Sequence, residues 1–214
     1  MTEKTVVIIA NGEELNPDLC RAIVSKDNII IAADGGAVAC QNAKIFPHYI
    51  IGDLDSVTED LQHFFSGSEI IHLTDQYSTD MEKALKLASS LSPHKVKILS
   101  ALGKRSDHAN ANLLFLQEYN DKIPVEIYDN YGKLTVLKPG KHQFELEIGR
   151  TISFFSFGPV GNLSLRGFRY NLANENYANY FVGNSNVVES KTCEIEFKRG
   201  RIFMYLINSL RQYE

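Results

Sequence analysis

Short apolar runs alternate with amphipathic or polar stretches through the first 130 residues of the chain. The runs lie at residues 5–10, 28–33, 49–51, 69–73, 95–100 and 125–128. The first of them, residues 5–10, is rich in β-branched residues and apolar at successive positions, as in a strand covered on both faces. Thr79 and Glu82 form a capping box, apolar residues then recur at helical spacing in residues 81–91, and residues 109–119 are typical of a helix. This alternation predicts an α/β domain with a mostly parallel sheet.

The pattern changes at about Gly132, where short alternating segments are separated by glycine and proline turns. Strands are predicted at residues 134–137, 144–148, 151–157, 193–197 and 202–206. Alternation with such frequent turns is typical of an antiparallel sandwich or barrel. We therefore divide the chain near residues 129–133, into an N-terminal α/β domain (1–130) and a C-terminal antiparallel domain (131–214).

Composition narrows the class of protein without naming a function. The chain has 214 residues, 44% of them hydrophobic, and a net charge of −4. Acids and bases are interspersed, so no basic face for nucleic acid is expected. No apolar run is long enough to span a membrane. The three cysteines are far apart and lack Cys-x-x-Cys spacing, which argues against a disulfide framework or a zinc site and favours reduced thiols in the cytoplasm.

Acidic residues follow several of the predicted strands. Asp53 and Asp55 come directly after an apolar run and Gly52, Asp34 follows the second strand, and Asp80 follows the fourth. In an open α/β sheet, ligands bind at the carboxyl ends of the strands. Asp53 and Asp55 could therefore share a hard ion such as Mg²⁺, which prefers oxygen ligands and is commonly held together with substrate phosphates. Taken singly, each acid is equally typical of a solvated turn or a helix cap.

Two further turns suit an anion at the same edge. Asp34 is followed by Gly35 and a second glycine, where backbone can approach a ligand closely. After the fifth strand, Lys104 and Arg105 follow a glycine and precede Asp107, and guanidinium matches phosphoryl oxygens in bidentate fashion. Four such turns on one edge favour phosphoryl-type transfer, although the chain has neither a P-loop motif nor the protein-kinase signatures.

These motifs, in this order, resemble those of the thiamine pyrophosphokinase family, and the resemblance spans nearly the whole chain. In the first domain they are residues 33–37, Pro47 with 51–56, 75–76 with 79–85, and 103–108 with 112–113. In the second domain they are residues 167–172 and 183–186.

The resemblance implies a fold and an activity. The fold would be an N-terminal α/β nucleotide- and metal-binding domain followed by a C-terminal β-sandwich for thiamine binding and dimerisation. The protein would be a homodimer with active sites in clefts between the subunits. It would transfer the pyrophosphoryl group of ATP to the hydroxyethyl oxygen of thiamine, giving thiamine diphosphate and AMP.

The resemblance also implies roles for individual residues. Mg²⁺ on the ATP phosphates would be held by Asp53, Asp55 and Asp80. Arg105 would counter the charge that develops as the bond between the α and β phosphates breaks. The nucleotide and phosphates would be lined by Asp34, Gly35, Gln76, Thr79, Lys104, Arg105 and Asp107. Ser185 and Asn186, from the other subunit, would help to bind thiamine.

Two departures from the family pattern stand out. Lys104 occupies a position where glycine is usual, and it either adds a phosphate contact or lies in solvent. The chain has no tryptophan, so aromatic packing on thiamine would come from tyrosine or phenylalanine, with Phe168, Tyr170 and Phe181 as candidates.

Two alternatives from other classes remain open at this point. Asp53-Leu54-Asp55 after an apolar strand also resembles the nucleophile loop of haloacid-dehalogenase-like phosphatases, in which Asp53 would attack phosphorus. A non-catalytic protein that binds thiamine or a nucleotide would use the same crevice. The sequence identifies neither the general base nor the preferred nucleotide and divalent ion.

Overall fold

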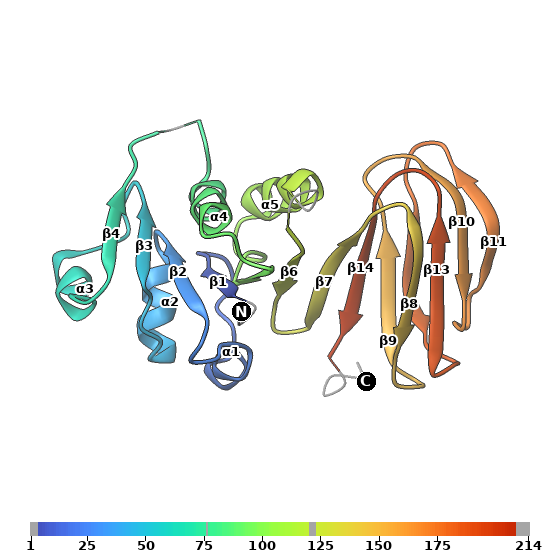
Figure 1. The fold of residues 1–214 in the computed structure, drawn as a ribbon, viewed down its shortest axis with the longest axis horizontal. Coiled ribbons are helices and arrows are strands. Elements are labelled where there is room, and N and C mark those ends of the chain that lie inside the picture. Colours follow the sequence, from blue (N-terminus) through green and yellow to red (C-terminus); the bar gives the residue numbers. More distant parts are fainter. Residues whose placement is uncertain (1–3, 76, 120–122, 209–214) are drawn as a thin grey trace. The chain divides into compact units, whose positions relative to one another are not determined.

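The computed structural model describes residues 4–75, 77–119 and 123–208. Its contacts divide the chain into two compact units, Met1–Asn130 and Tyr131–Glu214 (Figure 1). Among the helices of the described residues, none is both long enough and apolar enough to cross a membrane. Cys20, Cys40 and Cys193 are buried free thiols.

The first unit contains a parallel sheet with helices. Its strands are β1 (Thr5–Ile9), β2 (Ile29–Ala33), β3 (Tyr49–Gly52), β4 (Glu69–His72), β5 (Lys95–Leu99) and β6 (Val125–Tyr128). Its helices are α1 (Pro17–Ile23), α2 (Gly36–Ala43), α3 (Glu59–Phe64), α4 (Asp80–Ser90) and α5 (Ser106–Tyr119). The strands lie in the order β6-β5-β1-β2-β3-β4, and each neighbouring pair is parallel. The predicted N-terminal α/β sheet is confirmed.

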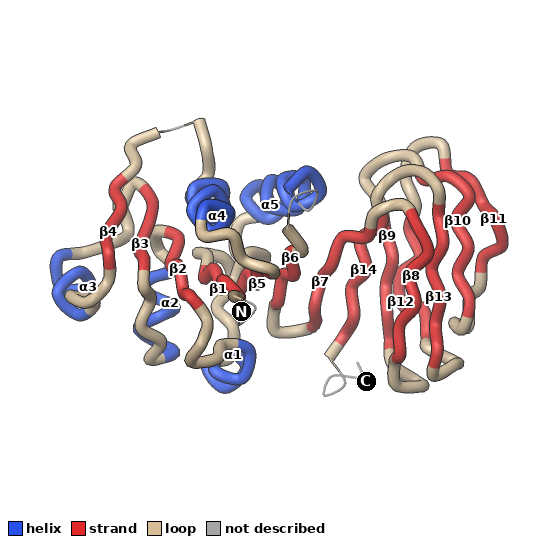
Figure 2. The backbone as a smooth tube through the Cα atoms, in the orientation of Figure 1, coloured by secondary structure: helices blue, strands red, loops and turns tan. Residues whose placement is uncertain are grey.

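The centre of this sheet is apolar on both faces. Val7 and Ile9 of β1 belong to a core cluster with side chains of α1, α2 and α3, so the alternating residues Val6 and Ile8 point to the opposite face. All four are at most 1% exposed. Helix α4 packs against β1, β2 and β3, and Figure 2 shows the helices around the strands. The continuous apolar run in β1 therefore reflects burial on both sides.

The second unit contains two antiparallel sheets. Their strands are β7 (Gly132–Leu137), β8 (Gly140–Glu145), β9 (Thr151–Phe155), β10 (Val160–Arg166), β11 (Leu172–Tyr177), β12 (Val182–Val187), β13 (Thr192–Phe197) and β14 (Ile202–Ile207). One sheet has the order β12-β9-β14-β7 and the other β11-β10-β13-β8. Side chains of both sheets, such as Phe154 of β9 and Phe197 of β13, share one core. The predicted C-terminal antiparallel sandwich is confirmed.

The sequence pattern misplaced one strand of this unit and missed others. The strand predicted at residues 144–148 is β8, which begins at Gly140 and ends at Glu145. Its pairing with β13 fixes that register, and Ile148 beyond it is 63% exposed although it continues the alternation. Strands β10, β11 and β12 were not predicted. In β11 and β12 the central residues 174–176 and 184–186 are polar and all but Asn186 are exposed, as is usual at a sheet edge, so no apolar alternation marks these strands.

Candidate active site

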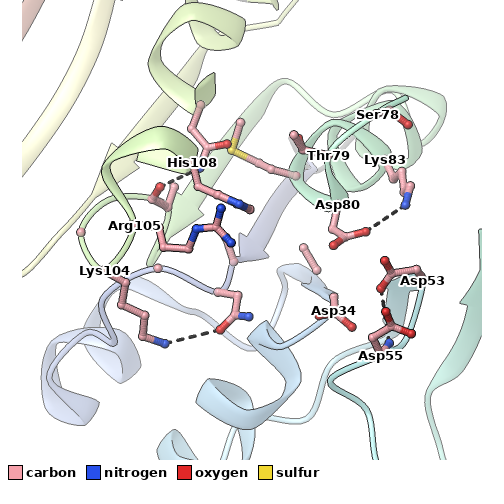
Figure 3. A pocket seen from close by; sticks show the side chains of 18 of the residues that line it. Asp34, Asp53, Asp55, Ser78, Thr79, Asp80, Lys83, Lys104, Arg105 and His108 are labelled. Carbon is pink, nitrogen blue, oxygen red and sulfur yellow. Dashed lines mark hydrogen bonds and ion pairs between the residues drawn. The ribbon is translucent and has the colours of Figure 1, made fainter. Parts of the chain in front are cut away.

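Three carboxylates converge at the carboxyl edge of the parallel sheet. Asp34 follows β2, Asp53 follows β3, and Asp80 is the first residue of α4. Each offers a carboxylate oxygen, and these three oxygens lie within 4.8 Å of one another (Figure 3). Asp34 is buried, whereas Asp53 and Asp80 are partly exposed. We call these three residues the acid triad. Oxygen ligands in this number and spacing fit a hard divalent cation such as Mg²⁺.

Gly52 gives the triad the space to form. A Cβ atom added at Gly52 would lie 2.9 Å from Cβ of Asp34 and 3.1 Å from Oδ1 of Asp80. The Asp34 backbone N–H donates to the carbonyl of Ile51 at 2.9 Å, which ties the end of β2 to β3. The glycine that ends the apolar run of β3 therefore permits two acids from other elements to approach it.

The start of α4 fixes Asp80. Thr79 is the N-cap residue, and its Oγ1 accepts from the Glu82 N–H at 3.2 Å. The Glu82 carboxylate in turn accepts from the Thr79 N–H at 2.9 Å, which completes the capping box that the sequence predicted. Since the box defines where the helix begins, it also places Asp80 at the first helical position.

Lys83 contacts the triad from one turn further along α4. Its side chain is 4% exposed, and its Nζ lies 3.0 Å from Oδ1 of Asp80. Lys83 was not predicted from the sequence to be a site residue. The i,i+3 spacing from Asp80 is the signal that was available, because residues three apart are neighbours on a helix surface.

Asp55 lies outside the acid triad. Its side chain is exposed, and its backbone N–H donates to Oδ1 of Asp53 at 3.3 Å. Its role as a metal ligand therefore stays a prediction. Asp34 was expected only to line the nucleotide, so its place beside Asp53 and Asp80 is an addition made by the structure.

Positive side chains lie across the site from the acids, on the segment between β5 and α5 (Figure 3). Lys104 Nζ donates to Asn11 Oδ1 at 3.4 Å. Arg105 forms two bonds to Asp107, with Nε to Oδ1 at 3.1 Å and Nη2 to Oδ2 at 2.5 Å. The hydrogen bonds from Arg105 lower the pKa of Asp107 to about 2, and those to Asp107 raise the pKa of Arg105. Both cations are exposed and therefore accessible to a ligand.

One cavity joins the acids and the cations. Its volume is about 420 Å³, which is in the range of small-molecule sites. Among its lining residues are Asp34, Asp53, Asp55, Asp75, Ser78, Thr79, Asp80, Lys83, Lys104, Arg105 and His108. Asp75 accepts hydrogen bonds from the Ser78 hydroxyl and the Tyr77 N–H, and the bond from Ser78 is the main cause of its lowered pKa.

Three predicted site residues of the first unit, Gln76, Gly35 and Asp107, do not line this cavity or cannot be placed. Gln76 lies outside the described residues. Gly35 is the N-cap of α2 and lines a smaller cavity of about 190 Å³. That cavity shares Asn11 and Lys104 with the larger one. Asp107 contacts the site through Arg105.

Ser185 and Asn186, the predicted thiamine residues, belong to β12 in the second unit. The Ser185 N–H donates to Ser153 Oγ at 3.0 Å. Asn186 is buried, and its Oδ1 accepts from the backbone N–H groups of Tyr170 and Val187 at 3.0 and 2.9 Å. Its Nδ2 donates to the Tyr170 carbonyl at 2.9 Å. Within its own chain, Asn186 therefore holds the turn that carries Tyr170, and contact with thiamine stays a prediction for both residues.

The three aromatic candidates differ in exposure. Phe168 and Phe181 are buried at 1% and 5% exposure, and Phe168 packs edge-on against Phe154 with ring centroids 5.3 Å apart. Tyr170 is 62% exposed. Of the three, Tyr170 is therefore the one that can pack on a ligand from the surface.

Fold and site together define a class of protein. Carboxylates suited to a divalent ion face an arginine and a lysine across one cavity at the carboxyl edge of a parallel sheet. Metal-bridged phosphates flanked by cations are the requirement of phosphoryl-type transfer. The arrangement is that of a nucleotide-dependent transferase with an α/β catalytic unit and an antiparallel β unit.

Comparison with known proteins identifies the family. A model of the thiamin pyrophosphokinase catalytic domain matches residues 20–127, and a model of its vitamin B1 binding domain matches residues 141–202. Thiamine pyrophosphokinase of Bacillus subtilis (strain 168) is 30% identical over 178 residues, covering 80% of this chain and 83% of the relative. The chain belongs to the thiamine pyrophosphokinase family.

Solved structures agree with this assignment. A crystal structure of thiamine pyrophosphokinase from Bacillus subtilis matches with a TM-score of 0.83 and 28% identity, covering 96% of this chain and 99% of that one. The enzyme from Geobacillus thermodenitrificans matches with a TM-score of 0.83 and 25% identity, covering 96% and 98% of the two chains.

Proposed function

We propose that this protein catalyses the Mg²⁺-dependent transfer of the pyrophosphoryl group of ATP to the hydroxyethyl oxygen of thiamine. The products are thiamine diphosphate and AMP. Family membership supports the synthesis of thiamine diphosphate from thiamine. The observation that carries the proposal is the acid triad facing Lys104 and Arg105 across one cavity.

In the proposed site, Asp53 and Asp80 hold the metal, with Asp34 or Asp55 as further ligands. Bound there, Mg²⁺ neutralises and orients the ATP phosphates. Arg105 and Lys104 bind phosphate oxygens from the other side of the cavity, and Arg105 offsets charge on the departing AMP. Asp107 holds the guanidinium of Arg105 in place through two hydrogen bonds.

The transfer forms one bond and breaks another. The thiamine hydroxyl oxygen bonds to the β phosphorus of ATP, and the bond from that phosphorus to the bridging oxygen of the α phosphate breaks. The bridging oxygen leaves with AMP, and the hydroxyl proton passes to a base or to solvent. The chain's contribution is mainly positioning and charge neutralisation, as expected for phosphoryl-type transfer.

The second unit is proposed to bind thiamine within a homodimer. Ser185 and Asn186 from a second copy would complete the site, and the exposed ring of Tyr170 is the available aromatic contact. We further propose that the protein works in the cytoplasm, where its three buried thiols remain reduced.

The two alternatives have less support. The phosphatase hypothesis assigned Asp53 as nucleophile, and the family comparisons do not support it. A non-catalytic binding protein would have little need for three clustered carboxylates, since like charges at this spacing repel one another. Product formation separates this alternative from the enzyme.

The test is a reaction containing the protein, ATP, Mg²⁺ and thiamine, with nucleotides and thiamine esters separated by chromatography. We expect AMP and thiamine diphosphate in equal amounts, and neither when any component is omitted. ADP with thiamine monophosphate would indicate an ordinary kinase. Phosphate release without thiamine would indicate a hydrolase, and binding without turnover a sensor.

A matched pair of variants connects the activity to the triad. Asp53→Asn should lower turnover on the order of 100-fold or more, since it removes charge at the phosphates. Asp60→Asn removes an exposed acid from the first turn of α3 and should leave turnover unchanged. Equal activity in both variants would overturn the proposed site.

A further inference from the structure

Lys83 is a buried charge on a helix face that is otherwise apolar. The other buried residues of α4 are Met81, Ala84, Leu85 and Ala88, whereas Lys83 is only 4% exposed. Lysine is almost never fully buried unless it is paired. Its Nζ lies 3.0 Å from Oδ1 of Asp80, so its partner is a member of the acid triad (Figure 3).

The triad concentrates negative charge in a small volume. Three carboxylate oxygens within 4.8 Å of one another repel strongly where water is partly excluded. Lys83 places a positive charge directly beside this group and takes one oxygen of Asp80 as its partner. The affinity of an oxygen-ligand site for a divalent ion depends on its net ligand charge, and Lys83 reduces that charge by one.

We propose that Lys83 is a positioning residue that acts as an internal counter-charge to the acid triad. It holds the Asp80 carboxylate and weakens the binding of a free divalent ion, so that the site takes the ion together with the nucleotide phosphates. This inference rests on the proposed function, because that function supplies the metal–nucleotide complex. The triad alone would bind the free ion more tightly.

The metal–nucleotide complex escapes this penalty because it makes additional contacts. Its phosphates would contact Lys104 and Arg105, which lie across the cavity from the triad, whereas a free ion offers these cations no oxygen to bind. Lys83 weakens the free ion and the complex alike at the triad, which keeps the free ion weakly bound, whereas the phosphate contacts restore the affinity of the complex. The result is discrimination between the two forms of the metal.

The test measures free Mn²⁺ binding by electron paramagnetic resonance, without nucleotide or thiamine. Lys83→Met gives an unbranched side chain one atom shorter with similar helix propensity, and it removes the charge. It should bind Mn²⁺ at least about tenfold more tightly than the wild type, because a unit charge beside the site is lost. Lys83→Arg retains the charge and should keep the weak binding. Lys86→Met removes an exposed charge from the same helix and should leave Mn²⁺ binding unchanged.

Wild-type or weaker Mn²⁺ affinity in Lys83→Met would overturn the inference, since Lys83 would then only support the fold. If that variant does not fold, the Mn²⁺ affinity of the wild-type protein tests the inference instead. Free Mn²⁺ should bind it weakly, with a dissociation constant above roughly 1 mM, and tight binding would contradict the counter-charge role. Absence of Mn²⁺ binding in all variants, even with ATP, would instead overturn the metal site of the proposed function.

Discussion

At the scale of single residues, several left-handed backbone conformations occur close to the acids and cations of the site. Asp34 has φ 42°, Leu54 between Asp53 and Asp55 has φ 65°, and Lys104 has φ 52°. Residues with a Cβ atom adopt this region at a cost of roughly 1–2 kcal/mol each. Such strain is common at functional sites, where the surrounding structure holds it in place.

Replacing Lys104 by glycine should distinguish the effect of its backbone strain on stability from the effect of its side chain on ATP binding. Lys104→Gly is expected to raise the free energy of unfolding by about 1 kcal/mol, because glycine adopts φ 52° without steric cost. The same change should raise the KM for ATP several-fold, since a phosphate contact is lost. Chemical denaturation and steady-state kinetics measure the two effects.

Lys44 provides the control for this prediction. It ends α2 with φ 56°, so Lys44→Gly relieves comparable strain at a position that does not line the cavity. Its stability should rise while the KM for ATP stays constant. An unchanged KM in Lys104→Gly would show that Lys104 lies in solvent and does not bind phosphate.

The ion pair of Arg105 and Asp107 should make a contribution to stability that depends on pH. The hydrogen bonds of Arg105 lower the pKa of Asp107 from 3.8 to about 2. Because the folded-state pKa is depressed, the stabilising contribution of this carboxylate is present above about pH 4 and is lost as the pH falls towards 2. The pair is exposed, so its effect on global stability should be small.

A carbon-13 NMR titration of labelled aspartate checks this prediction. Arg105→Met should return the pKa of Asp107 to near its ordinary value of 3.8. A pKa that stays near 2 in the variant would mean that another group, and not Arg105, holds the carboxylate charged.

At the scale of elements, the start of α4 connects helix capping to the site. Thr79→Ala removes the capping box and should lower the free energy of unfolding by about 1 kcal/mol. Because the box sets the first helical residue, Asp80 should also lose its fixed position, and turnover should fall. Thermal denaturation and the product assay measure the two effects.

A second helix cap supplies the comparison. Thr58 caps α3, and its Oγ1 accepts from the Leu61 N–H at 3.3 Å. Thr58→Ala should lower stability by a similar amount and leave turnover intact, since α3 carries none of the proposed ligands. A parallel loss of turnover in both variants would mean that activity follows stability alone.

The sequence predicted elements best where burial leaves a clear pattern. The central parallel strands β1 and β2 are apolar on both faces, and the predicted capping box of α4 is present in the structure. Edge strands β11 and β12 were missed because their central residues, 174–176 and 184–186, are polar and interrupt any apolar alternation. Strand β8 was predicted too far along the chain because the alternation of apolar and polar residues continues beyond Glu145. The end of the strand is set by its pairing with β13.

The site was partly predictable for a related reason. A place at the end of a strand is visible in sequence, so Asp34, Asp53 and Asp80 were identified as candidates. Which carboxylates converge depends on side-chain direction and on the space left by Gly52, so the inclusion of Asp34 in the triad was not predicted. Lys83 was not recognised because a buried, paired lysine looks the same in sequence as a solvated one.

At the scale of the whole molecule, the two units match the two domains of one enzyme family. The catalytic-domain model matches residues in the first unit and the vitamin B1 binding model matches residues in the second. The acid triad and the cations Lys104 and Arg105 all belong to the first unit. We therefore propose that the parallel sheet carries the phosphate chemistry and that the second unit recognises thiamine.

Transfer of the β and γ phosphates as one group can be tested directly with ATP labelled with ³²P at the γ position. With the wild-type protein, Mg²⁺ and thiamine, the label should appear in the terminal phosphate of thiamine diphosphate. An equal amount of unlabelled AMP should form, with no ADP. If the label appeared in thiamine monophosphate or in free phosphate, together with ADP, pyrophosphoryl transfer would be excluded.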